Sequence, residues 1–249
     1  MSQLESATPA GEQNTMSSDL HIPVLDKGYV RYIKHMGDDL DVINSAKVSF
    51  DREAATFEEK EARLLAFLVR DGHTSTMRHS AVTVEMYAPL LVARQAWKYV
   101  VASSHVEDQL GWNESSRRYI TENVEYYLPG PGEWRTAPEN RKQGSGPVVS
   151  DEIGEEFTAA LKEYQRKGTM LYEYAMEAGL APEQARLFLP AYGLYVRWRW
   201  TFSLGAGLHF LHQRLAHDAQ REIFLYAEAV RDILREHFPN AVAATIENI

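Results

Sequence analysis

Cysteine is absent from all 249 residues of the chain. This absence excludes disulfides, zinc–thiolate sites, iron–sulfur clusters and thiol nucleophiles. Long apolar runs are missing too, since no stretch approaches the ~20 residues that a membrane span needs. The N-terminus has neither the basic start nor the apolar core of a signal peptide. We therefore expect a cytoplasmic protein.

Basic residues are too few for a protein that binds polymeric nucleic acid. The chain has 26 Lys and Arg against 35 Asp and Glu, which gives a net charge of −9. Such proteins hold the phosphate backbone with an excess of Lys and Arg. A mononucleotide stays possible as a ligand, because it needs only a few well-placed arginines.

The composition is that of a globular protein, with 45% hydrophobic and 24% charged residues. Nothing separates the two halves of the chain, so we expect a single domain over residues 21–249. Residues 1–20 are rich in Ser, Gln, Thr and Glu and predict a disordered tail. Residues 129–147 combine prolines, glycines and charges without periodicity, which predicts a long mobile loop.

Two stretches are typical of strands, namely 24–30 and the alternating segment 82–87. Between them, Thr56 and Glu59 have the spacing of a capping box, which predicts a helix over 57–71 that ends at Gly72.

Further helices are predicted by apolar residues on one side. They cover residues 90–101, 151–177, a short stretch from Pro182, and 219–237 as the last. The helix over 151–177 carries Ile153, Phe157, Leu161, Tyr164 and Leu171 on one side, and the last helix has a predicted buried face of Ile223, Tyr226, Val230, Ile233 and Leu234. The fold class is therefore α+β and helix-dominated.

The run Trp112-Asn113-Glu114-Ser115-Ser116-Arg117-Arg118-Tyr119 combines two guanidiniums with several donors and one carboxylate. Arg118 and Ser116 suit a phosphate, since one offers a bidentate fork and the other a hydroxyl. Asn113 and Glu114 are able to read a base edge or a ribose. A solvated polar loop explains the same run.

Three more arginines stand beside apolar residues. Arg94, followed by Gln95, comes directly after an apolar stretch, which predicts either the lip of a pocket or a surface helix. Arg186 and Arg214 are each flanked by apolar residues. Each is either held in a pocket by an anion or extends to solvent from a helix.

His209, His212 and His217, with Asp218, are the candidate metal ligands, because an i, i+3 histidine pair on a helix can face one metal. Tightly interleaved apolar residues explain this segment by ordinary helix packing, so we expect no metal site.

Taken together, these motifs resemble the flavin-dependent thymidylate synthases. The similarity runs from about Val24 to Pro239 in the order of that family. Its elements are Leu25-Asp26-Lys27-Gly28, Ala46-Lys47-Val48-Ser49-Phe50, Gly72-His73-Thr74-Ser75 with His79, Val92-Ala93-Arg94-Gln95, Asn113 to Tyr119, Ala185 to Pro190, and Arg214 to Ile223. The Asn-Glu-x-Ser-x-Arg-Tyr run is the most specific of them.

The resemblance implies a helix-flanked antiparallel sheet and a homotetramer with active sites between subunits. The nucleotide residues that it implies are Arg94, Gln95, Glu114, Ser115, Ser116, Arg117, Arg118, Arg186 and Arg214. The implied flavin residues are His73, Ser75, Lys98, Tyr99, Glu114, Ser203, Gly205 and His209.

The chain departs from the family at two places. The family has Arg-His-Arg shortly after the Arg-Gln pair, whereas this chain has Lys98-Tyr99-Val100 and an extra segment near 102–111 that carries His105. Downstream, Ser203 and Gly205 stand where the family places an Asn and an Arg against the flavin. Both departures are on the flavin side, and Lys98 and His105 are candidates to replace the lost contacts. We expect the segment 102–111 to order over bound ligands as a lid.

By the resemblance, the chain transfers a one-carbon unit to C5 of dUMP, UMP or both. The implied carbon donor is methylenetetrahydrofolate, and the implied hydride source is FAD reduced by NADPH. The chain has no cysteine to attack C6 and no base is evident beside Ser116, so reduced flavin carries the chemistry. Arg214 is the candidate for stabilising negative charge on the pyrimidine. One branch of the family, which methylates UMP as well as dUMP, serves nucleoside-antibiotic biosynthesis. The alternatives are a metal-dependent nucleotide hydrolase and a non-catalytic nucleotide-binding relative.

Overall fold

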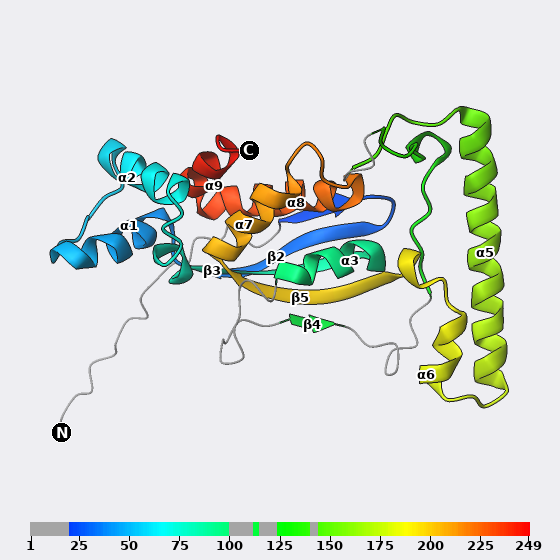
Figure 1. Cartoon of the computed structure of the whole chain (residues 1–249). Coiled ribbons are helices and arrows are strands. Elements are labelled where there is room, and N and C mark those ends of the chain that lie inside the picture. The colour runs from blue at the N-terminus through cyan, green and yellow to red at the C-terminus, as the bar shows by residue number, and fades with distance from the viewer. Residues whose placement is uncertain (1–19, 100–111, 115–123, 140–143) are drawn as a thin grey trace, which may run out of the picture.

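The computed structural model describes residues 20–99, 112–114, 124–139 and 144–249 (Figure 1). Within them, an antiparallel five-stranded sheet has the order β1-β2-β3-β5-β4. The strands are β1 (His21–Val24), β2 (Gly28–Met36), β3 (Ala81–Pro89), β4 (Trp112–Glu114) and β5 (Tyr195–Ser203). The predicted strand over 82–87 is β3, and the strand-like stretch 24–30 is the turn of the β1–β2 hairpin with its flanks. The predicted tail lies outside the described residues, except for Leu20.

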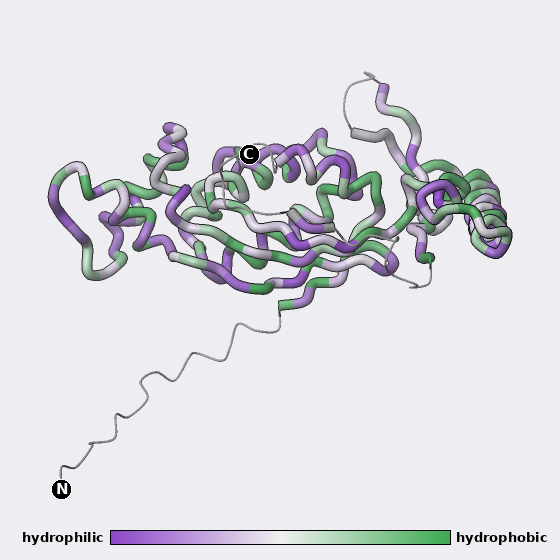
Figure 2. Tube along the Cα trace, turned by 90° about the horizontal axis from the view of Figure 1, so that it is seen from below, coloured by the Kyte–Doolittle hydropathy of each residue, from purple (hydrophilic) through white to green (hydrophobic). Residues whose placement is uncertain are grey.

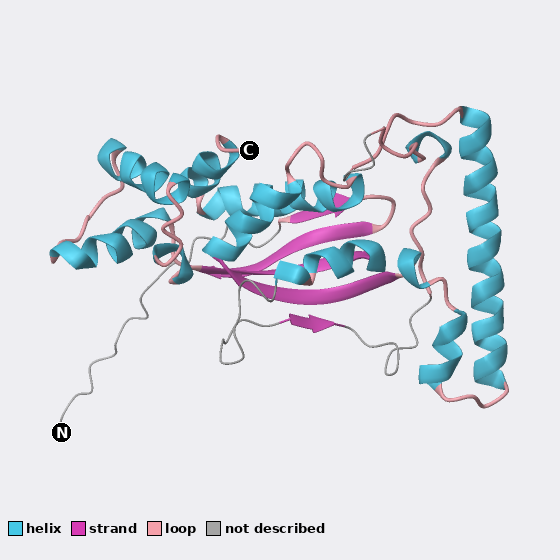
Figure 3. Ribbon diagram, in the orientation of Figure 1, coloured by secondary structure: helices cyan, strands magenta, loops and turns pink. Residues whose placement is uncertain are grey.

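Helices flank this sheet, as the α+β prediction requires (Figure 3). They are α1 (Asp39–Lys47), α2 (Glu59–Arg70), α3 (Leu90–Ala96), α5 (Asp151–Glu177), α6 (Pro182–Ala185), α7 (Leu204–Arg214), α8 (Arg221–His237) and α9 (Pro239–Ile246). Single 3-10 turns include η2 (Thr76–Arg78), η3 (Pro131–Glu133) and η4 (Arg186–Phe188). Helices α7 and α8 lie over one face of the sheet with α9 packed against them and α2, whereas α5 and α6 stand at the side of the sheet (Figure 1). Of the helices described, none has the length and apolar composition to cross a membrane.

The core lies between the sheet and its covering helices. Strands β3 and β5 place their alternate residues on it as the cross-strand pairs Val82–Phe202, Val84–Trp200 and Met86–Trp198, all of them buried. On the opposite face Thr83 bonds Thr201 through their hydroxyls at 2.9 Å, and Glu85 pairs with Arg199 at 3.6 Å. Figure 2, viewed from below, shows hydrophobic and hydrophilic residues alternating along the strands.

Helix α2 corrects one local prediction. Its N-cap is Glu58, which makes no side-chain cap hydrogen bond, and Thr56 Oγ1 donates to Glu58 Oε1 at 3.2 Å. The prediction of a capping box formed by Thr56 and Glu59 is therefore wrong, because Thr56 precedes the N-cap residue. Its hydroxyl donates to the side chain of Glu58 instead. Gly72 does follow the helix end, with a φ of +70°.

Helix α8 begins at Arg221 rather than Ala219, and the five residues of its predicted face are all 0% exposed. It is not the last helix, which corrects a second prediction. Pro239 opens α9, and Asp39 on α1 caps this helix by accepting from the backbone nitrogens of Asn240 at 2.7 Å and Ala241 at 3.2 Å. Helix α5 has its predicted bounds, and Ser150 caps its start.

The turn Leu25-Asp26-Lys27-Gly28 fastens the β1–β2 hairpin to distant segments. Asp26 Oδ1 accepts from Tyr195 Oη at 2.6 Å, and Lys27 Nζ donates to the carbonyl of Tyr126 at 3.0 Å. This motif of the sequence therefore has a structural role in the described part of the chain.

Gly28 closes this turn where no side chain fits. Tyr226 Oη donates to the carbonyl of Tyr87 at 2.7 Å. A Cβ on Gly28 would overlap the Tyr226 hydroxyl and lie 2.6 Å from that same carbonyl oxygen. We expect Gly28→Ala to lower the free energy of unfolding by about 1–3 kcal/mol, the usual cost of forcing atoms into a packed site. Urea unfolding measures it, with Gly132→Ala as the control because nothing lies within 4 Å of that added Cβ. Equal stabilities of the two variants would contradict the steric argument.

Candidate active site

The helices that carry candidate residues start at opposite ends of the β3–β5 pair. Strand β3 leads into α3, and β5 leads into α7. Because the strands are antiparallel, with Ala81 opposite Ser203, the two helices run back along the sheet from its two ends. Tyr99, just after α3, consequently meets α7, with its ring centroid 5.0 Å from that of Phe210 and 5.7 Å from that of His209.

Arg214 is the last residue of α7 and lies half-buried beside Tyr99, with its Cζ 5.5 Å from the ring centroid. Its Nε is buried and has no hydrogen-bond partner among the described residues. Burial raises the pKa of Tyr99, whereas the charge of Arg214 and a side-chain hydrogen bond with it lower that pKa in part. A buried donor without an acceptor costs free energy in the folded protein. Arg214 is therefore positioned to donate to an anionic or carbonyl-bearing ligand.

Gln95 stands in the last turn of α3 and is tied to the start of α8. Its Nε2 donates to Gln220 Oε1 at 2.6 Å and, more weakly, to the carbonyl of Leu91 at 3.4 Å. Arg94, its neighbour, is exposed. Helices α3, α7 and α8 therefore meet near Gln95 and Arg214.

The predicted flavin residues gather at the other end of α7. His73 and Ser75 are exposed in the connection from α2 to η2. Ser203 is buried and caps α7, because its Oγ accepts from the backbone nitrogen of Ala206 at 3.2 Å. A Cβ on Gly205 would lie 3.5 Å from Met77 Cβ, so η2 packs directly on the first turn of α7.

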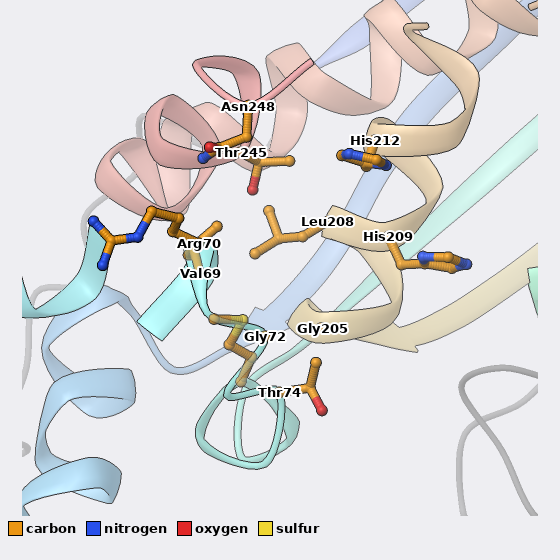
Figure 4. A pocket seen from close by; sticks show the side chains of 11 residues that line it. Val69, Arg70, Gly72, Thr74, Gly205, Leu208, His209, His212, Thr245 and Asn248 are labelled. Atoms are coloured by element: carbon orange, nitrogen blue, oxygen red, sulfur yellow. The ribbon is translucent and has the colours of Figure 1, made fainter. Parts of the chain in front are cut away.

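A cavity of about 230 Å³ opens between these elements (Figure 4). It is lined by Val69, Arg70, Gly72, Thr74, Met77, Gly205, Leu208, His209, His212, Thr245 and Asn248. Leu208 and His212 point from α7 toward Thr245 on α9, whereas His209 points to the other side of α7 (Figure 4). Sequence reasoning missed the α9 wall, although Pro239 at the first helical position signals that helix.

Arg186 does not join these groups within the described part of one chain. Arg186 is exposed on η4, which packs against α5 and α6, and α6 lies across the sheet from α2 (Figure 1). Lys98 is exposed after α3. Glu114 ends β4, where its backbone is paired with Trp198. The calls on 115–118, including Ser116 and Arg118, and on the segment 102–111 lie outside the described residues.

The histidine cluster separates in the structure. His209 and His212 both line the cavity, with the ring of His209 near Tyr99, whereas His217 and Asp218 line a different cleft. Among the described residues, no group of three or more His, Asp or Glu is arranged to hold a metal. The three histidines and Asp218 therefore do not come together as one group in this part of the chain.

Comparison with solved structures defines the class of fold. The chain is similar to the UMP/dUMP methylase PolB from Streptomyces cacaoi in its structure bound with 5-Br dUMP, with a TM-score of 0.76 at 21% identity. The match covers 91% of this chain and 97% of that one. The fold is thus the helix-flanked antiparallel sheet of the flavin-dependent thymidylate synthase type.

Sequence comparison gives the family. The model of the thymidylate synthase complementing protein family matches residues 31–240. A flavin-dependent thymidylate synthase of Thermus thermophilus is 37% identical over 234 residues, 94% of this chain and 81% of that protein. That of Thermotoga neapolitana is 35% identical over 229 residues, 92% and 95% of the two chains. The chain belongs to this family and is a thymidylate synthase-like methyltransferase.

The unpartnered Nε of Arg214 generates a stability prediction. Arg214→Met removes a buried donor without a partner together with the side-chain hydrogen bond to Tyr99, so we expect the two effects to offset and the free energy of unfolding to stay within about 1 kcal/mol of the wild type. Arg135→Met is the control, because Arg135 donates to Ser145, to the carbonyl of Glu133 and to Glu222, and its loss should destabilise. Urea unfolding of both variants checks this. A clear loss of stability in Arg214→Met would show that its guanidinium is satisfied in the free protein.

Proposed function

We propose that this enzyme methylates C5 of a uridine nucleotide, either dUMP or UMP or both. Relatives at 35–37% identity are named flavin-dependent thymidylate synthases, and the similar solved structures are of a UMP/dUMP methylase bound with 5-Br UMP and 5-Br dUMP. The observation that carries the proposal is Arg214, whose buried Nε lies beside an aromatic ring and lacks a partner among the described residues. A guanidinium stays charged at all working pH values, so it stabilises negative charge on a pyrimidine without exchanging a proton.

A flavin is the cofactor that fits this chain. With no cysteine in the sequence, a thiol cannot add to C6 of the base. The cavity between η2, α7 and α9 has apolar walls from Val69, Met77 and Leu208 and polar groups at Thr74 and His212. Its volume takes one ring system of a dinucleotide, so the remainder of FAD would lie outside it.

In this proposal FAD, reduced by NADPH, supplies the reducing equivalents, and methylenetetrahydrofolate supplies the carbon. The residues of the chain bind, orient and stabilise charge. Arg214 acts on the base, while Ser116 and Arg118 hold the phosphate with Arg186. Gly205 and His209, with the segment that contains His73 and Ser75, contact the flavin.

A second copy of the chain is needed to complete this site, because Arg186 is apart from the other residues. Helix α5 offers the contact surface. Its buried side uses small residues, and a Cβ on Gly168 would lie 2.6 Å from Pro190 Cδ. Apolar side chains that flank this buried side are exposed, with Phe157 at 51% and Tyr164 at 60%. We propose that other copies cover this stripe in a homotetramer, since so large an apolar face in water favours association.

The activity has a direct test. Purified protein should bind FAD, seen as the visible absorption of oxidised flavin, and should convert dUMP or UMP to its 5-methyl form with NADPH and methylenetetrahydrofolate. Mass spectrometry of the nucleotide detects the product. Arg214→Met should bind nucleotide about 10- to 100-fold more weakly, because a charge-assisted hydrogen bond is lost. A colourless protein that binds either nucleotide without turnover would favour the non-catalytic alternative.

The subunit contact is tested by Tyr164→Glu, which places a charge in the apolar stripe. We expect light scattering to show a smaller assembly, and nucleotide affinity to fall as Arg186 leaves the site. Lys162→Glu introduces the same residue at an exposed position of α5 outside the stripe and should leave both unchanged. A wild-type protein that is monomeric, or an unaltered mass in Tyr164→Glu, would refute the contact.

A further inference from the structure

Tyr99 stands where the family has the histidine of its Arg-His-Arg motif, so its role is particular to this chain. It comes shortly after α3, and only 5% of it is exposed. A buried tyrosine hydroxyl usually finds a hydrogen-bond partner. The partner in this structure belongs to α7.

The ring of Tyr99 is fixed by aromatic residues of the core. It meets the ring of Phe210 edge to face, with the two centroids 5.0 Å apart and an interplanar angle of 86°. Phe210 in turn meets Trp200 of β5 edge to face, with a centroid distance of 5.5 Å. Phe210 and Trp200 are both 0% exposed. Such close packing leaves the ring of Tyr99 few orientations against α7.

Arg214 lies within reach of this fixed ring. It is four residues after Phe210 on α7, and residues four apart lie on the same side of a helix. Its Cζ is 5.5 Å from the centroid of the Tyr99 ring, and its side chain forms a hydrogen bond with that of Tyr99. The guanidinium is the donor, because arginine has no acceptor. Tyr99 therefore holds Arg214 both by its ring and by its hydroxyl.

The hydroxyl of Tyr99 leaves the charge of Arg214 available to a ligand. Burial raises the pKa of Tyr99 although Arg214 lowers it in part, so the hydroxyl is neutral at physiological pH. It orders the guanidinium without forming an ion pair. An arginine that is ordered before the ligand arrives loses less conformational freedom on binding, and this favours affinity.

The position of Tyr99 along α7 separates it from the proposed flavin cavity. That cavity lies at the first turns of the helix, where Gly205 and Leu208 line it. Tyr99 meets the later residues Phe210 and Arg214. The resemblance implies a flavin contact for Tyr99, whereas these contacts favour a role on the nucleotide side.

We propose that Tyr99 is a positioning residue, which holds the guanidinium of Arg214 in the orientation that meets the base of the nucleotide. This inference rests on the proposed function and adds a residue that acts on the nucleotide only through Arg214.

The test is a double-mutant cycle of Tyr99→Phe and Arg214→Met, measured as dUMP affinity by calorimetry with FAD present. Tyr99→Phe removes the hydroxyl and keeps the ring on Phe210. We expect it to weaken dUMP binding about 5- to 10-fold, since the guanidinium is no longer held. In the Arg214→Met background the same change should alter the affinity by less than about twofold, because the residue through which Tyr99 acts is gone.

Tyr195→Phe is the matched control. It also removes the hydroxyl of a buried tyrosine, one that donates to Asp26 at 2.6 Å from the start of β5. It should lower the stability to urea and leave the affinity for dUMP unchanged. A purely structural role of the Tyr99 hydroxyl would give the same result in Tyr99→Phe.

The outcomes separate the inference from the proposed function. Equal dUMP affinities of the wild type and Tyr99→Phe overturn the inference, and so does an equal loss in both backgrounds, because Tyr99 then acts independently of Arg214. A wild-type protein that binds neither dUMP nor UMP refutes the proposed function. The same cycle measured by urea unfolding needs no ligand, and an absence of coupling between the two side chains there would also overturn the inference.

Discussion

The pairing of β3 with β5 is the constraint on which the rest of the molecule depends. Nine consecutive residue pairs, from Ala81–Ser203 to Pro89–Tyr195, lock the two strands antiparallel. Each strand leads straight into a helix, so α3 and α7 start at opposite ends of the sheet. A slip of one residue would turn every core side chain to the other face. It would also move Tyr99 away from α7, so the core and the site share one register.

Polar groups in the described structure divide into two kinds. Asp26, Asp39 and Arg135 each make several or short hydrogen bonds and fasten distant segments together. The buried Nε of Arg214 has no hydrogen-bond partner in the part of the chain that the structure describes. Binding sites carry such groups because the ligand supplies the missing partner, and the stability they cost is regained elsewhere in the fold.

Helix α5 carries the exposed apolar surface on which the proposed assembly of several chains is based. Glycines let one side of it pack closely on η3 and Pro190, so that this side needs no large apolar residues. Large apolar residues that flank this side, among them Phe157 and Tyr164, are exposed to solvent in the single chain. The same arrangement places Arg186 beside α5 and away from Arg214. Burial of the stripe and completion of the site would then occur together.

Much of the secondary structure could be predicted from the sequence, because its causes are local. Helix α5 has its predicted bounds, β3 follows the predicted alternation, and the predicted face of α8 is buried. Apolar periodicity predicts a helix or a strand because it depends only on residues that are close to one another in the sequence. The capping box at Thr56 was wrong because the N-cap of this helix is Glu58, two residues after Thr56, and the spacing of residues does not show where the helix begins.

The motifs themselves placed the chain in its family, and the candidate residues on α3 and α7 came from them. Tertiary structure decided which of these residues meet. The register of β3 and β5 brings Arg214 to Tyr99, and α9 closes the cavity from the end of the chain, while the position of α5 leaves Arg186 apart. Asp26 and Gly28 belong to a motif of the family resemblance. In the structure Asp26 accepts a hydrogen bond from Tyr195, and Gly28 leaves room for the hydroxyl of Tyr226. Such proximity depends on contacts between residues more than a hundred positions apart, which no local pattern contains.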